Sequence, residues 1–80
     1  MEDTIVLAAT PRLVAVTPDG ATAFITHQGG SVSVLDLATR TVEAVIPVGG
    51  DPFGVAITPD GMTALTTDLL NDSVSVIDVP

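Results

Sequence analysis

The sequence of 80 residues predicts an all-β fold made of two copies of one small unit. Residues 11–20 return as residues 52–61 at a shift of 41, and residues 31–36 return as residues 73–78 at a shift of 42. The one extra residue falls in segment 68–72, where a surface hairpin loop tolerates an insertion. Valine, isoleucine and threonine recur in runs of about five between proline, aspartate and glycine, which is typical of short strands.

Eight strands follow from these runs. We expect them at residues 4–8, 13–17, 22–26, 31–36, 41–48, 54–58, 63–67 and 73–79. The Pro-Asp-Gly sequences at 18–20 and 59–61 predict hairpin turns, because proline fixes φ, aspartate bonds nearby backbone and glycine adopts positive φ. Asp36 is expected to accept backbone N–H groups in the turn after the fourth strand. Segment 49–52 is a flexible link into Pro52, which must sit at or before a strand start.

Several of these strands are apolar on both faces, notably 13–17, 55–58 and much of 41–48. Strands that are buried on both sides have this pattern, whereas a two-sheet sandwich would show cleaner alternation. Sheets packed between other sheets, repeated with a period near 40 residues, are the geometry of β-propeller blades. Neither one nor two such units can bury both faces of every sheet, so the sequence predicts assembly.

The composition also favours assembly. A chain of 80 residues has a limited core, yet 46% of its residues are apolar. There is no cysteine, so neither a disulfide framework nor a thiolate metal site compensates for the small size. Oligomerisation is the remaining way to stabilise the fold.

Charge and hydropathy exclude several classes of partner. The net charge is −8, with only Arg12 and Arg40 opposing ten acids, so we expect no nucleic-acid partner and no anionic membrane surface. The apolar runs are far shorter than the roughly 18 residues of a spanning helix. The first residues lack the basic region of a secretory signal, so a cytoplasmic location is the default expectation.

Three blocks of the sequence carry a resemblance to a known family: Pro52-x-Gly-Val-Ala-Ile-Thr-Pro-Asp-Gly61, Ser73-Val-Ser-Val-Ile-Asp78 and Thr41-Val-x-x-x-Ile46-x-Val-Gly49. Together they resemble the YVTN family of β-propeller repeats over nearly the whole chain. The family's naming motif is degenerate here, since Ala23-Phe-Ile-Thr26 and Ala64-Leu-Thr-Thr67 stand in its place. Leu13 also replaces the glycine found at Gly54.

The resemblance implies four antiparallel strands in each blade and hence a division of the chain. Residues 10–50 would form blade 1, and residues 51–80 the first three strands of blade 2. Residues 2–5 align with residues 43–46 at a shift of 41. Residues 1–9 are therefore expected to be an outermost strand that completes a blade of a neighbouring chain.

This layout predicts a closed propeller formed by homo-oligomerisation, so that the partner of the chain is itself. A ring of two-bladed chains has an even number of blades, six from three chains or eight from four, within the range of about four to eight. We favour the trimer because it orders fewer subunits. A head-to-tail interface that closes gives such a cyclic oligomer.

On this blade order, the loops at 27–30, 49–52 and 68–72 gather at one end of the ring. The candidate ligand-binding residues at that end are His27, Asp51, Asp68, Asp72, Arg12 and Phe53. A histidine with carboxylates could hold a divalent cation. Because one histidine and scattered acids on loops are more often solvated, no metal site is predicted.

No catalytic signature is recognisable in the sequence. It contains no cysteine, lysine or tyrosine and no Gly-x-Ser-x-Gly motif, and its serines recur within strands. We therefore expect no enzyme activity and no cofactor, and a non-catalytic propeller scaffold or binding ring, whether a natural chain, a fragment or an engineered piece of a larger YVTN-type propeller. The alternative, by fold analogy alone, is a subunit of a quinoprotein-like or metal-binding propeller enzyme.

Overall fold

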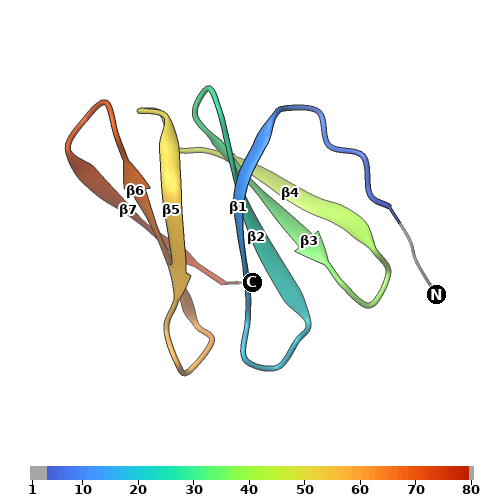
Figure 1. Cartoon of the computed structure of the whole chain (residues 1–80). Helices are drawn as coiled ribbons and strands as arrows, with labels where there is room; N and C mark the ends of the chain where they lie inside the picture. The colour runs from blue at the N-terminus through green and yellow to red at the C-terminus, as the bar shows by residue number, and fades with distance from the viewer. Residues whose placement is uncertain (1–3, 80) are drawn as a thin grey trace.

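The computed structural model describes residues 4–79 and consists of two antiparallel sheets packed against each other (Figure 1). Sheet A has the spatial order β1 (Pro11–Val16), β2 (Thr22–His27), β3 (Ser31–Asp36) and β4 (Thr41–Pro47). Sheet B has the order β5 (Pro52–Ile57), β6 (Thr63–Asp68) and β7 (Ser73–Asp78). The described residues include no helix, and hence none that is long and apolar enough to cross a membrane. The predicted all-β class is confirmed.

The two sheets repeat each other in detail, as the sequence repeat predicts. Pro11 lies opposite His27 in sheet A, and Pro52 lies opposite Asp68 in sheet B; the register is irregular directly after each proline. In both sheets a threonine hydroxyl fills this irregularity. Thr26 Oγ1 accepts from the N–H of Leu13 at 3.2 Å, and Thr67 Oγ1 accepts from the N–H of Gly54 at 2.8 Å.

The Pro-Asp-Gly turns form as expected. Asp19 Oδ1 accepts from the Thr17 hydroxyl at 2.6 Å and from the N–H of Ala21 at 2.9 Å, while Gly20 has a φ of 75°. The second turn repeats these bonds with Thr58, Asp60, Met62 and Gly61. Asp36 Oδ1 accepts from the N–H groups of Ala38 and Thr39, which confirms its predicted role in the turn after β3.

The core lies between the two sheets. Its buried members are Phe24, Val32 and Val34 from sheet A and Ala64 and Ile77 from sheet B. Half-buried apolar residues surround them: Ile46, Val48, Val55, Ile57 and Val79. Each sheet is therefore covered by the other on one face. The expected burial of both faces is not reached within one chain, since Val14 and Val16 of β1 remain 62% and 51% exposed.

The expected strand at residues 4–8 does not form a ladder in the single chain. A strand needs a neighbour to accept and donate its backbone hydrogen bonds, and no edge of sheet A or B meets this segment. Instead the segment runs along the outside of sheet A (Figure 1). Residues 1–3 and Pro80 lie outside the described residues, and with them part of the predicted match between residues 2–5 and 43–46.

Candidate functional site

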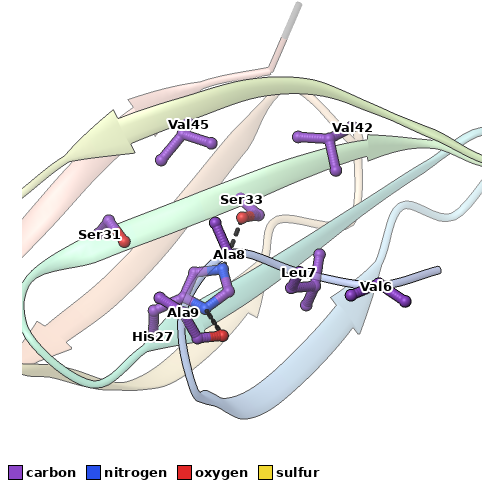
Figure 2. Close-up of a pocket in the computed structure, with 9 residues that line it drawn as sticks. All are labelled: Val6, Leu7, Ala8, Ala9, His27, Ser31, Ser33, Val42 and Val45. Carbon is purple, nitrogen blue, oxygen red and sulfur yellow. Dashed lines mark hydrogen bonds between the residues drawn. The ribbon is translucent and has the colours of Figure 1, made fainter.

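Residues 6–9 cross the face of sheet A that points away from sheet B, and they leave a cavity beneath them (Figure 2). Its volume is about 350 Å³. The lining is mostly apolar, with three polar side chains, and consists of Val6, Leu7, Ala8, Ala9, His27, Ser31, Ser33, Val42 and Val45. Nothing in the sequence repeat singles out this cavity, because it depends on how the N-terminal segment folds back over sheet A.

His27 ties that segment to the sheet. It is the last residue of β2 and is buried, with Nδ1 lying 3.1 Å from the carbonyl oxygen of Ala9 and Nε2 lying 2.5 Å from Ser33 Oγ (Figure 2). Because a carbonyl can only accept, Nδ1 carries a proton, and in the neutral ring Nε2 accepts from the serine hydroxyl. Both nitrogens are thus occupied. The sequence predicted His27 to lie in a solvated loop. This prediction is wrong, because β2 extends one residue further than expected and the side chain is buried.

Asp68 occupies the place of His27 in sheet B. It ends β6, is buried, and its Oδ2 accepts from the hydroxyls of Ser73 at 3.1 Å and Ser75 at 2.8 Å. Its Oδ1 atom and the Thr66 hydroxyl are buried without a hydrogen-bond partner among the described residues. Asp72, by contrast, is exposed in the β6–β7 loop with a φ of 50°. The two acids therefore do not form a joint site.

The other three predicted residues come together where β1 and β5 begin. Arg12 Nη2 lies 3.1 Å from Asp51 Oδ1 and 3.2 Å from Asp51 Oδ2, and the guanidinium carbon lies 5.4 Å from the centroid of the Phe53 ring. The pair links β1 of sheet A to the residue that precedes β5 of sheet B. Since the positive charge of Arg12 is already matched by Asp51, this cluster is better suited to joining the sheets than to holding a charged ligand.

No group of three or more metal-ligating side chains comes together within residues 4–79. The six predicted residues therefore do not form one site. His27 and Asp68 are buried and hydrogen-bonded within their own sheets, Asp72 is exposed, and Arg12, Asp51 and Phe53 form an ion-paired cluster.

The outer face of sheet B has the composition of a buried face. Its residues Leu65, Val74 and Val76 are 37%, 56% and 68% exposed. The repeat places them at the positions of Phe24, Val32 and Val34 in sheet A, which are 0%, 0% and 1% exposed because sheet B covers them. The same three positions thus form the core in one sheet and open surface in the other.

The outer face of sheet A is the counterpart of this surface. Val14 and Val16 correspond to Val55 and Ile57, which are half-buried against the core on the side of sheet B that meets sheet A. The chain therefore exposes the outer face of sheet B and part of the outer face of sheet A, where Ala23 and Leu35, the counterparts of the core residues Ala64 and Ile77, are buried. The repeat, with its shifts of 41 and 42 residues, identifies these faces once the buried residues of one sheet are known.

Comparison with solved structures finds chains of similar fold. The fold is similar to that of hydrazine synthase from Kuenenia stuttgartiensis, with a TM-score of 0.85 and 35% sequence identity. The match covers 99% of this chain and 23% of the hydrazine synthase chain, so the chain spans about a quarter of the length of that relative. No protein-family model and no curated protein sequence matches.

Proposed function

We propose that this chain is a non-catalytic building block of a β-propeller that assembles with copies of itself into a closed ring. Sheet A is its first blade and sheet B its second. The repeated Pro-Asp-Gly turns and strand motifs support a place in the YVTN family, despite the degenerate naming motif. The interaction surface of the module is the pair of outer sheet faces.

The observation that carries this proposal is the contrast between equivalent positions in the two sheets. Phe24, Val32 and Val34 are buried, whereas their counterparts in sheet B are open to solvent. Exposed apolar surface of this kind marks an interaction site in a soluble protein. The surface that covers the three residues in sheet A belongs to sheet B, and the outer face of sheet A offers the equivalent residues in a second copy.

Such an interface joins two different surfaces, so association continues head to tail until the ring closes. Each copy adds two blades, and rings of two, three or four copies would hold four, six or eight blades, which spans the usual range of about four to eight. We retain the trimer as the favoured ring, because the two-copy ring lies at the lower limit and the four-copy ring orders more subunits.

The second candidate is a subunit or a piece of a larger propeller enzyme. The similarity to hydrazine synthase over 99% of this chain favours it, because that relative is named as an enzyme. Against it, His27 and the Ser33 hydroxyl to which it is hydrogen-bonded are only 1% and 3% exposed, which leaves almost no surface of this pair open to a substrate. An absorbance spectrum of the purified protein that reveals a retained cofactor would support the enzyme.

Two matched variants test the assembly. Val76→Glu puts a charge on the outer face of sheet B, and Met62→Glu puts one near the β5–β6 turn, at residues that are 68% and 67% exposed. In sedimentation-velocity experiments we expect Val76→Glu to abolish the oligomer, because a charge buried without a partner is costly. Met62→Glu should sediment as the wild type does. Equal effects of the two variants would contradict the proposed interface.

A further inference from the structure

We propose that residues 4–6 of one copy form the fourth strand of sheet B in an adjacent copy, paired with β7 in a defined register. This inference rests on the proposed ring and specifies how its copies are joined. The N-terminal segment meets sheet A in the same way as the link from β4 meets sheet B.

The backbone reaches both sheets in the same way. The N–H of Gln28 donates to the carbonyl of Thr10 at 2.9 Å, and the N–H of Leu69 donates to the carbonyl of Asp51 at 3.3 Å. These two pairs are related by the 41-residue shift. The link that precedes Asp51 continues from β4, the last strand of sheet A, which ends at Pro47. The residues that precede Thr10 therefore stand where the outermost strand of another sheet would stand.

The side chains of the two segments are buried in the same alternation. Ile5 and Leu7 are half-buried while Val6 between them is exposed, just as Ile46 and Val48 are half-buried on either side of exposed Pro47. Alternation with a period of two is the pattern of a strand that has one covered face. The N-terminal segment thus already presents a strand-like face, although it belongs to neither sheet within residues 4–79.

The pairing of β3 with β4 fixes the expected register. Ser31 lies opposite Pro47, Val32 opposite Ile46 and Ser33 opposite Val45. Applying the two repeat shifts to these pairs gives the pairing between copies. We expect Ser73 opposite Val6, Val74 opposite Ile5 and Ser75 opposite Thr4.

The acceptor edge for this strand lies on another copy. Within residues 4–79, β7 pairs only with β6, so its outer edge is open. Figure 1 places β7 and the N-terminal segment on opposite sides of the molecule, which excludes pairing within one chain. Open sheet edges are prone to pair with other chains. A second copy that docks sheet B onto the outer face of sheet A would bring β7 beside this segment.

A disulfide experiment can test the register, because the chain contains no cysteine. Residues opposite each other on antiparallel strands have Cα atoms about 4.5 to 5.5 Å apart, within the range of about 4.4 to 6.8 Å that a disulfide spans. The matched pair is Val6→Cys on one chain and Ser73→Cys on another. The control pair is Val6→Cys with Ser75→Cys, which shifts the second cysteine by about 7 Å along the strand.

The two single variants of each pair are mixed, one of them labelled with ¹⁵N, and oxidised after subunit exchange. Native mass spectrometry of the reduced mixture reports assembly, and the mass of the cross-linked species identifies disulfides between copies. We expect the matched pair to give at least a fivefold higher yield than the control pair. Equal yields, or no disulfide in mixtures that do assemble, would overturn the strand exchange and leave the ring proposal standing. Absence of assembly in the reduced mixtures and in the wild type would overturn both.

Discussion

The Nδ1 atom of His27 lies 3.1 Å from the carbonyl oxygen of Ala9, so the end of β2 holds the N-terminal segment against the outer face of sheet A. In sheet B the same strand position is Asp68, and the chain that approaches it is the link from β4 to β5. The single chain thus contains one complete junction, between sheet A and sheet B. It also contains one half of a second junction, formed by the N-terminal segment on the outer face of sheet A. A second copy of the chain would supply the missing half.

Replacement of His27 by alanine should destabilise the fold. It leaves the Ala9 carbonyl and the Ser33 hydroxyl without their partner and creates a cavity at a buried site, so we expect a loss of about 2 to 4 kcal/mol. Urea denaturation measures this loss. Gln28→Ala at the exposed neighbouring residue is the control and should change stability by less than about 0.5 kcal/mol. Similar denaturation midpoints for His27→Ala and the wild type would show that the hydrogen bonds of His27 do not stabilise the fold.

A mixing experiment should reveal the polarity of the interface. Val76→Glu damages the outer face of sheet B, and Val14→Glu damages the outer face of sheet A, so neither variant should form rings alone. Each retains the surface that the other lacks. In a mixture we expect complexes of one copy of each variant, which light scattering detects, and no larger species. If the mixture remained monomeric, the head-to-tail arrangement would be wrong.

Deletion of residues 1–9 should weaken assembly. The deletion removes Ile5, Leu7 and the backbone that we expect to pair with β7, and it leaves an open sheet edge. We expect at least a tenfold increase in the dissociation constant of the oligomer, together with aggregation visible by light scattering. An oligomer of unchanged stability after removal of residues 1–9 would rule out a role for this segment in assembly.

Acid should destabilise the protein partly through its two Pro-Asp-Gly turns. The pKa of Asp19 is lowered from its ordinary value of 3.8, first by the hydrogen bond from the Thr17 hydroxyl and then by the N–H of Ala21. The pKa of Asp60 is lowered in the same way by Thr58 and Met62. Because the folded pKa values lie below the unfolded ones, this stabilisation is complete above the unfolded value of about 3.9 and is lost as the pH falls through the folded values.

The measurement is urea denaturation between about pH 6 and pH 2, an interval that includes this transition. The double variant Asp19→Asn/Asp60→Asn should lose stability less steeply than the wild type in the acid range. Glu43→Gln/Asp72→Asn removes the same formal charge from exposed positions and serves as the control for net charge. Parallel profiles of the wild type and the Asp19/Asp60 variant would exclude the turns as a source of acid sensitivity.

The features that the sequence predicted correctly are those determined by local chemistry. The turns at Asp19 and Asp60 form because each carboxylate bonds residues within two positions of it, and the strands around them follow from runs of β-branched residues. The fold class follows from the same signals. The repeat also placed equivalent residues of the two sheets correctly, as the shared register at Pro11 and Pro52 shows.

The features that could not be predicted depend on packing between segments far apart in the chain. The sequence predicts His27 in a loop. It does not reveal that β2 continues to this residue or that Ala9 folds over it. The ion pair of Arg12 with Asp51 joins residues 39 positions apart, and it exists only because β1 and β5 are neighbours. For the candidate site residues, the sequence therefore does not reveal which side chains are already engaged within the chain.

Native mass spectrometry of the wild-type protein tests the central claim most directly, because it reads the number of copies in the assembled species. The account predicts a discrete closed oligomer, with a mass three or four times the 8.1 kDa of one chain and the trimer favoured. A folded, compact monomer of 8.1 kDa at micromolar concentration would contradict it.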